Sequence, residues 1–292
     1  MIKKLQRRFA LSEKGAVDTI KGSIFCALQN ISFMLPVSLL YCFVKDLLEN
    51  ELSSRCIPFY ALGSVVCAAI ILICTRFQYN GTFLATYVET GVRRVALAEK
   101  LRKIPLSFFG KRDLADLTSA IMNDCAVLET SQSHHVSPLI GAVISTTLIS
   151  VMLLIYNWRM GLAVVWVLPV AFMIIALAAR VQKSLSRKSM KAKITCEDGI
   201  QECMETMSDL RANNAEKEYL KGLEKKIRSV EKRLVASELG TAVFVVSAGL
   251  VLRLGIASTA LMGAYLLVGG KLSMLTFFMY LLVASRLYDP LE

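Results

Sequence analysis

The chain has 292 residues, of which 55% are hydrophobic, and its formal net charge is +11. A mean hydropathy of +0.53 excludes an ordinary soluble domain and is typical of a polytopic membrane protein. The basic residues lie between apolar runs instead of forming a groove interleaved with aromatic side chains, so the charge indicates membrane topology and not nucleic-acid binding.

Cysteine and histidine follow no pattern of a metal or disulfide site. The eight cysteines contain no C-x-x-C pair, and five lie in or beside apolar runs, where cysteine behaves as a small hydrophobe. His134 and His135 are adjacent and have no cysteine or carboxylate at metal-ligand spacing. We therefore predict neither a disulfide framework nor a metal site.

Residues 1–21 combine six basic residues with interleaved apolar side chains, which is typical of an amphipathic helix on the inner leaflet. A cleaved signal peptide is the alternative interpretation. No small-residue cleavage site follows the apolar stretch, however, and further apolar segments come after it. We therefore expect an N-terminal elbow helix that stays attached to the chain.

Six apolar segments follow, and we expect each to cross the membrane as a helix that rises about 1.5 Å per residue. The expected spans are residues 22–44, 56–77, 136–156, 160–179, 239–268 and 272–287. Only Asn157, Trp158 and Arg159 separate the third span from the fourth, which predicts an antiparallel hairpin. The resulting fold class is an all-α membrane protein with six transmembrane helices.

Charge separates the two sides of the membrane. Residues 45–55 hold two basic and three acidic residues and are placed outside. Residues 78–135 hold seven Lys or Arg and residues 180–238 hold fourteen, so both segments are placed in the cytoplasm. Apolar residues recur at helical spacing in the first of these segments, which predicts that the second and third spans continue as helices well past the membrane. Both termini are then expected inside.

The first cytoplasmic segment contains a proline-broken, aromatic turn with basic residues on either side. Pro105 interrupts a helix and Gly110 ends one, so a short element is expected between them. Phe108 and Phe109 either close a small local core or insert into a partner protein, and exposed aromatic residues rimmed by charge favour the partner. The residues assigned to this turn are Pro105, Ser107, Phe108, Phe109, Gly110 and Lys111.

The segment also holds four carboxylates that could be mistaken for acid–base pairs. They lie among Lys and Arg with no nucleophile nearby, so we interpret them as salt-bridged or solvated and predict no catalytic residue. These residues are Asp113, Asp116, Asp124 and Glu129.

A few polar residues interrupt the spans and are candidates for a path through the membrane. Arg253 lies near the middle of the fifth span, where an arginine costs about 2.5 to 3.5 kcal/mol on insertion scales. It either lines a wet cavity and contacts an anionic or polar substrate, or it pairs with a neighbouring helix or snorkels. Weaker candidates, whose side chains could also bond only to the backbone, are Gln29, Asn30, Thr146 and Ser150.

Four stretches together resemble the transmembrane domain of exporter-type ABC transporters. They are KIPLSFFGKRDLADLTSAIMNDC from Lys103, NWRMGL from Asn157, the segment 200–223 with NNAEKEYLKGL, and the terminal SRLYDPLE. The resemblance covers essentially the whole chain. The first loop and the following HHVSPLIGA look most like the branch that contains heterodimeric siderophore transporters.

The resemblance implies a domain-swapped dimer, either of identical or of different halves, in a plasma membrane such as the bacterial inner membrane. It also implies that the tips of the two cytoplasmic loops are coupling helices, which dock into grooves on nucleotide-binding domains. Residues 105–111 match the first tip. The second tip is matched by a segment whose assigned residues are Asn213, Asn214, Glu216 and Tyr219.

The phosphate-binding motif G-x-x-x-x-G-K-[ST] does not occur in the chain. Gly269, Gly270 and Lys271 are followed by Leu272, and Tyr265 stands where the first glycine would be. No cofactor is therefore expected on this chain, whereas ATP and Mg²⁺ are expected on a nucleotide-binding domain. That domain either follows in a longer polypeptide, which the linker-like Asp289, Pro290 and Leu291 favour, or belongs to a separate one.

The leading hypothesis is the membrane-spanning part of an ABC transporter, coupled to ATP hydrolysis through the loop tips. The alternative is an ATP-independent membrane scaffold or channel-like protein, which the missing phosphate loop favours. A membrane-bound enzyme has the least support because no nucleophile, base or metal constellation occurs.

Overall fold

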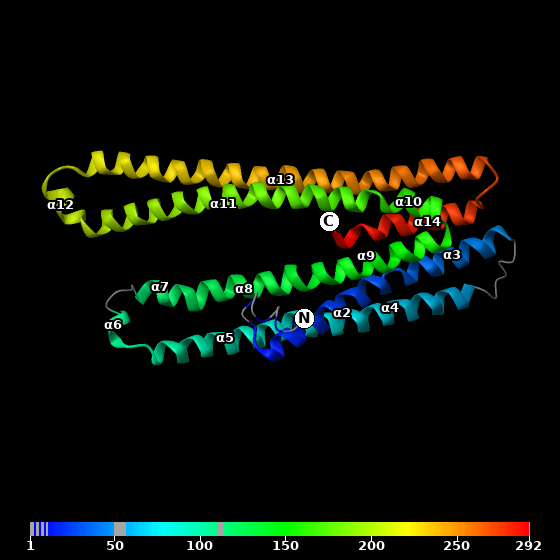
Figure 1. Cartoon of the computed structure of the whole chain (residues 1–292), viewed down its shortest axis with the longest axis horizontal. Helices are drawn as coiled ribbons and strands as arrows, with labels where there is room; N and C mark the ends of the chain where they lie inside the picture. The colour runs from blue at the N-terminus through cyan, green and yellow to red at the C-terminus, as the bar shows by residue number, and fades with distance from the viewer. Residues whose placement is uncertain are drawn as a thin grey trace. The chain divides into compact units, whose positions relative to one another are not determined.

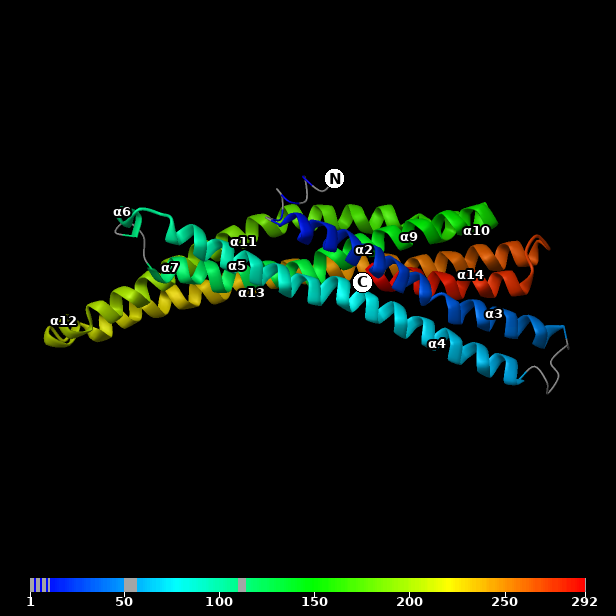
Figure 2. The same ribbon diagram turned by 90° about the horizontal axis from the view of Figure 1, so that it is seen from below.

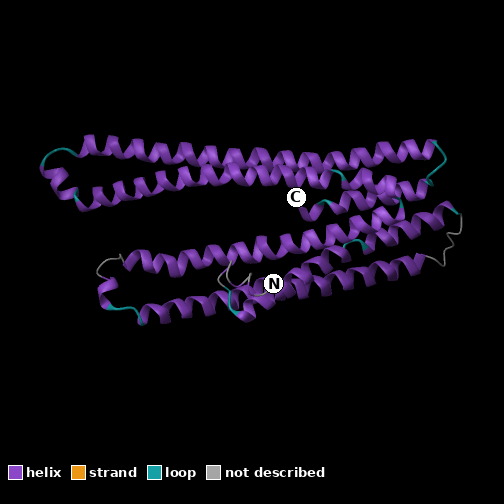
Figure 3. Ribbon diagram, viewed as in Figure 1, coloured by secondary structure: helices purple, strands orange, loops and turns teal. Residues whose placement is uncertain are grey.

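The computed structural model describes residues 3, 6, 9, 11–49, 57–109 and 114–291, and every regular element in these residues is a helix (Figures 1 and 3). The predicted all-α fold is confirmed. The chain divides into two compact units. The first unit comprises Met1–Leu162 and Thr259–Glu292, and the second comprises Ala163–Ser258.

Within the described residues, five helical segments are long and apolar enough to cross a membrane. They are Glu13–Leu48, Ile57–Arg102, Leu117–Tyr156, Trp158–Glu205 and Glu216–Val268. The sixth expected span forms helix α14 (Met274–Leu287), whose 14 residues measure about 21 Å at the usual rise per residue. Because this is shorter than the hydrocarbon core, the sixth span stays a prediction.

The first unit is a bundle built around helix α2 (Glu13–Ser32), which packs against both α4 (Ile57–Tyr79) and α9 (Ser137–Tyr156). Helix α3 (Leu35–Leu48) packs against α4 and α14. Small residues permit the close approach of α2 and α9. A Cβ atom at Gly141 would lie 2.9 Å from the Ser23 carbonyl oxygen and 3.0 Å from the Ala27 amide nitrogen.

Proline residues explain the two breaks that interrupt long apolar segments. Pro36 lies in the first turn of α3, directly after the turn at Phe33 and Met34 that ends α2. Pro169 lies in the first turn of α11 (Val167–Glu205), directly after the break at Trp166. A proline has no N–H to donate and its ring clashes with the preceding turn, so the helix restarts beside it.

The N-terminal elbow is only partly described. Of the first ten residues, the three that the structure describes, Lys3, Gln6 and Phe9, are helical. The Ser12 hydroxyl then caps α2 by accepting from the Gly15 amide at 3.0 Å. Helix α2 continues without a break across residues 21 and 22, so the expected boundary between elbow and first span is not a helix end.

The first unit carries a helical arm that extends beyond the apolar bundle. Its outgoing strut continues α4 through a π-turn, η1 (Asn80–Leu84), into α5 (Ala85–Arg102). Its returning strut consists of α7 (Leu114–Ser119), η2 (Ala120–Asp124), α8 (Cys125–Ser131) and η3 (Gln132–Val136), and leads into α9. Helix α5 packs against α8, where Arg94 and Glu129 form an ion pair at 4.0 Å. We call this pair of struts the first arm.

The second unit is a long antiparallel helix pair. Helix α10 (Trp158–Val165) leads into α11, and α11 lies beside α13 (Glu216–Val268) in both views (Figures 1 and 2). Hydrogen bonds between side chains join the two helices at intervals, namely Trp166 to Ser258 at 3.0 Å and Thr241 to Gln182. The short helix α12 (Met207–Ala212) connects them at the tip. We call the polar part of this pair the second arm.

The close approach of α2 and α9 predicts that Gly141→Ala lowers the melting temperature in detergent, because the new methyl group pushes apart two packed helices at a cost of about 1 to 3 kcal/mol. Gly91→Ala is the matched control. A Cβ at Gly91 meets nothing within 4 Å, so the better helix propensity of alanine should stabilise α5 by about 1 kcal/mol or less. Equal melting temperatures for the two variants would contradict the packing at Gly141.

Candidate functional site

The tip of the first arm is the four-residue helix α6 (Leu106–Phe109), which lies between α5 and α7 (Figure 1). Its turn is closed by the Phe108 amide, which donates to the Pro105 carbonyl at 3.0 Å. Pro105 and Ser107 are exposed. Gly110 and Lys111 lie outside the described residues, so four of the six residues assigned to this tip have a described position.

Phe108 and Phe109 are each only half-buried. Their rings meet edge to face with centroids 5.9 Å apart, a favourable geometry for an aromatic pair. The two rings thus cover each other in part, yet both leave surface open. The pair therefore combines a small local contact with an exposed apolar surface at the tip.

The second arm has a differently built tip. Helix α12 ends in a turn in which Asn214 has a φ of 53°, the left-handed conformation that asparagine tolerates better than most residues. Asn213 Nδ2 donates to the Asp209 carbonyl at 2.8 Å, and Arg211 pairs with Glu216 at 3.6 Å across the turn. Both asparagines are exposed.

Tyr219, in the first turn of α13, fastens this tip to the opposite helix. Its hydroxyl hydrogen-bonds the Gly199 carbonyl at 3.1 Å and the Glu202 carboxylate at 2.9 Å. Desolvation, together with these contacts to Glu202, raises the pKa of Tyr219 above its ordinary value. The tyrosine therefore stays a neutral donor that holds α11 and α13 together near the tip.

The short helix at the second tip is residues 207–212, whereas the segment assigned from the sequence is 213–219. The four assigned residues lie directly after α12: Asn213 and Asn214 form the turn, and Glu216 and Tyr219 begin α13. The assigned segment thus covers the turn and one helix start, while the short helix itself lies one to two turns earlier in the chain.

The polar residues of the first unit hold its helices together. Gln29 Nε2 donates to the Thr75 hydroxyl on α4, and Asn30 Nδ2 donates to the Ser145 hydroxyl on α9, each at 3.2 Å. Among the described residues, the buried hydroxyls of Thr146 and Ser150 have no hydrogen-bond partner. Buried polar atoms of this kind are uncommon, and they mark a place where water or a ligand group could bind.

Arg253 belongs to the second unit. It lies in α13 and its side chain is exposed on the isolated chain. The other four path candidates, Gln29, Asn30, Thr146 and Ser150, all belong to the first unit. The first unit therefore brings Gln29 and Asn30 into contact with neighbouring helices, whereas Arg253 is a residue of the other unit.

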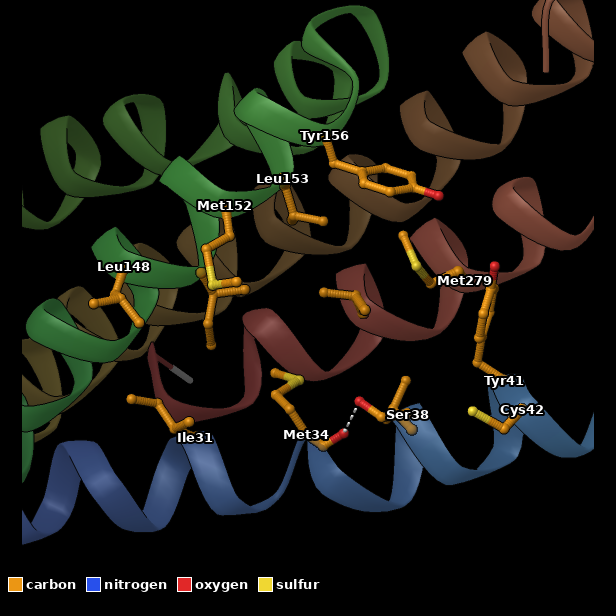
Figure 4. Close-up of a pocket in the computed structure, with 13 residues that line it drawn as sticks. Ile31, Met34, Ser38, Tyr41, Cys42, Leu148, Met152, Leu153, Tyr156 and Met279 are labelled. Atoms are coloured by element: carbon orange, nitrogen blue, oxygen red, sulfur yellow. Dashed lines mark hydrogen bonds between the residues drawn. The ribbon is translucent and has the colours of Figure 1, made fainter. Parts of the chain in front are cut away.

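An apolar pocket of about 390 Å³ opens in the first unit, which is large enough for a small organic ligand. Figure 4 shows three methionines converging from different segments: Met34 at the start of α3, Met152 on α9 and Met279 on α14. The flexible, polarisable methionine side chain adapts its shape to what it contacts. The polar groups of the lining are Ser38, Tyr41, Cys42 and Tyr156.

A buried carboxylate at the base of the first arm is not among the residues predicted from the sequence. Glu89 on α5 is only 6% exposed, and its carboxylate accepts from the Ser12 amide at 2.7 Å and from the Ser12 hydroxyl at 2.6 Å. It lies at the N-terminus of α2, where the helix dipole favours a negative charge. A Cβ at Gly15 would overlap this carboxylate, so the glycine makes room for it.

This contact extends into a buried polar cluster. Thr19, one turn further along α2, donates to the Gly15 carbonyl at 2.8 Å and accepts from Gln132 Nε2 of η3 at 2.8 Å. One face of α2 therefore contacts both struts of the first arm through hydrogen bonds. The one local signal in the sequence is Ser12 as a helix cap; no spacing rule relates it to Glu89, 77 residues away.

In the described part of the chain, no three His, Cys, Asp or Glu side chains gather where a metal ion could bind. Glu129, one of the four loop carboxylates, forms the ion pair with Arg94. The positions of Asp113 and of the Asp116 side chain are not described.

Comparison with known proteins identifies the family. The model of the ABC transporter transmembrane region matches residues 22–291. No curated protein matches the chain. Since the matched region covers nearly the whole chain and the five long apolar helices fit a multi-pass membrane protein, the chain belongs to the ABC transporter transmembrane region family.

Proposed function

We propose that the chain lines the translocation path of an ABC transporter and is driven by ATP hydrolysis on a nucleotide-binding domain that docks at the arm tips. The observation that carries this proposal is α6, a short helix with two half-buried phenylalanines at the end of a long arm, in a chain of this family. An arm that ends in water gains nothing from exposed aromatic side chains, whereas exposed aromatic side chains are typical of protein interfaces.

The arms suit the transmission of motion. Helix α5 continues the membrane helix α4 through a single π-turn, so a displacement of the tip acts on the bundle along a nearly continuous helix. The polar cluster around Glu89 and Ser12 ties the base of the same arm to α2. Movement of α6 would then shift α2 and α4 together, and with them the helices that line the pocket.

The second arm supplies the second contact in this proposal. Its docking segment comprises α12 and the following turn, from Met207 to Tyr219, and so includes the assigned residues Asn213, Asn214, Glu216 and Tyr219. The exposed asparagines and the Arg211–Glu216 ion pair offer polar groups, in contrast to the aromatic first tip. The two tips would therefore bind different surfaces.

The translocation path is proposed to combine the methionine-lined pocket with the polar residues Gln29, Asn30, Thr146, Ser150 and Arg253. Two such chains, identical or different, would enclose the path as a domain-swapped dimer. Both termini and both arms are placed in the cytoplasm, and the membrane is the plasma membrane. ATP and Mg²⁺ would bind the nucleotide-binding domain, and the siderophore branch stays a prediction about the cargo.

A test of the first tip is the double variant Phe108→Ala, Phe109→Ala in the transporter assembled with its nucleotide-binding domains. Membrane insertion should be unchanged, while substrate transport per ATP hydrolysed falls about tenfold or more, because interface aromatics are frequent hot spots. Transport and ATPase activity are measured together in proteoliposomes.

The control for this test is Phe59→Ala, which removes an exposed phenylalanine from α4 at a distance from the tip. It should leave the coupling ratio unchanged. If the double variant instead unfolds, or transports with normal coupling, the two rings form only a local core. Transport by the natural assembly that needs no ATP hydrolysis would favour the ATP-independent scaffold.

Arg253 provides a test of the path. The Arg253 side chain is exposed on the isolated chain, so Arg253→Met removes no buried side chain and should keep the melting temperature in detergent close to that of the natural chain. Transport of an anionic substrate should fall about tenfold or more if the guanidinium contacts the substrate. Substrate-stimulated ATPase activity is the second measurement.

Arg253→Lys should recover only part of the transport, because an ammonium group cannot reproduce the bidentate fork of the guanidinium. Normal transport by Arg253→Met would remove Arg253 from the path. The path would then be sought along Gln29, Asn30 and the hydroxyl-bearing face of α9.

A further inference from the structure

Helix α11 carries a concentrated basic surface where the apolar part of the helix ends. Four basic side chains and one serine line a shallow pocket of about 390 Å³ there. We call this surface the basic face, and its residues are Arg180, Lys183, Ser184, Arg187 and Lys188. All five are exposed. The coupling proposal does not use this surface.

The basic face points away from the other helix of the second unit. At about 100° per residue its five positions fall within a sector of about 140° of α11. Gln182, which bonds Thr241, and Leu185, which lies against Gly240, contact α13 from the opposite side of the helix. The cations therefore face outward from the second unit.

The charges on the basic face are not neutralised by neighbouring carboxylates. Within the described residues, no ion pair involves Arg180, Lys183, Arg187 or Lys188, whereas Lys193 further along the same helix pairs with Glu197 at 3.7 Å. Arg233 of α13 adds a cation nearby, since its Nη1 donates to the Lys188 carbonyl at 3.4 Å. The surface thus presents excess positive charge to whatever lies beside it.

The depth of the basic face along the membrane normal decides which negatively charged partner the face can meet. The twenty residues between Arg159 and Arg180 carry no charge and form α10 and the start of α11, which together measure about 30 Å at the usual helical rise. If Arg159 stands at one edge of the hydrocarbon core, Arg180 stands at the other. Lys183 follows about 5 Å and Arg187 about 10 Å beyond it. Polar headgroups occupy about 5 to 8 Å on each side of the hydrocarbon.

The side chains of the basic face also tilt toward the membrane end of α11. The Cα–Cβ bonds of a helix tilt toward its N-terminus, and the N-terminal part of α11 is its membrane part. Arg187 and Lys188 can therefore reach back toward the bilayer with their long flexible stems. All four cations come within reach of one headgroup layer, and a guanidinium binds a phosphate through two parallel hydrogen bonds.

We propose that the basic face of α11 binds the headgroups of anionic phospholipids at the membrane surface. The position at the hydrocarbon edge and the tilt of the side chains favour a lipid phosphate over a soluble anion. Bound lipid would hold α11 at a fixed depth in the membrane. This inference goes beyond the proposed function, because it requires neither ATP nor a nucleotide-binding domain.

The test is native mass spectrometry of the purified chain in nonionic detergent with equal amounts of phosphatidylglycerol and phosphatidylcholine. The natural chain should retain phosphatidylglycerol preferentially. In the triple variant Arg180→Gln, Lys183→Gln, Arg187→Gln this preference should fall about 100-fold, since each of the three basic residues near an anionic surface contributes about 1 kcal/mol and about 1.4 kcal/mol corresponds to a factor of ten. Raising the salt concentration should weaken the preference as well.

Two further variants test whether the lipid preference depends on where the basic residues lie and on their charge. Lys217→Gln, Lys221→Gln, Lys225→Gln removes the same charge from exposed positions on α13. The Tyr219–Gly199 contact places these positions about 18 Å or more along the arm from Arg180, so this control should keep the lipid preference. Arg180→Lys with Arg187→Lys should keep most of it too, because the charges remain.

Equal phosphatidylglycerol retention by the natural chain and the Arg180, Lys183, Arg187 triple variant would overturn the proposal. So would an equal loss in the α13 control, which would indicate an effect of net charge alone. Complete displacement of the lipid by millimolar inorganic phosphate at constant ionic strength would identify a soluble-anion site instead. Helix content measured by circular dichroism must match among the variants for the comparison to count.

Discussion

The constraint on which the rest of this structure depends is that hydrocarbon offers no hydrogen-bond partner to the peptide backbone. Every N–H and C=O group inside the bilayer has to be satisfied within the helix, so a helix cannot end there without cost. The helices accordingly run on beyond the apolar region, and Ile57–Arg102 and Trp158–Glu205 carry the chain directly from membrane to arm tip. Two of the apolar segments are interrupted beside Pro36 and Pro169, where the proline removes a backbone donor that the interrupted helix would need.

Continuity alone would leave the arms loosely attached, and polar contacts at the base of the first arm supply the attachment. The Glu89 carboxylate caps the N-terminus of α2 through Ser12, and Gln132 reaches Thr19 of the same helix from the returning strut. A buried, hydrogen-bonded network of this kind favours one arrangement of the helices, since any other would leave its members without partners. These hydrogen bonds tie the first arm to the start of α2, and the proposed transmission between tip and membrane depends on this attachment.

The second unit has paired charges in one part of its length and an excess of cations in another. Along the second arm beyond the basic face, ion pairs such as Lys193–Glu197 and Glu224–Arg228 balance the charges of exposed helices. Among the described residues, the cations of the basic face form no ion pair, although ten acidic residues occur in the segment 180–238. The positive-inside rule accounts for the presence of basic residues in such a loop, but it does not explain why they lie on one face of α11 within a short length of the helix. The anionic lipid surface explains both the gathering and the depth.

The sequence by itself determined the membrane class, the helical fold, the family resemblance and the short element at Pro105, because hydrophobic length, charge bias and proline chemistry act locally along the chain. Only the tertiary structure decided which residues meet. Glu89 and Ser12 are 77 residues apart, and neither looks unusual in its own segment. The short helix of the second tip runs from Met207 to Ala212, and the left-handed turn at Asn214 follows it. Contacts of this kind depend on how whole helices pack against one another. The residue spacing within one helix does not specify which residue of another helix will lie opposite.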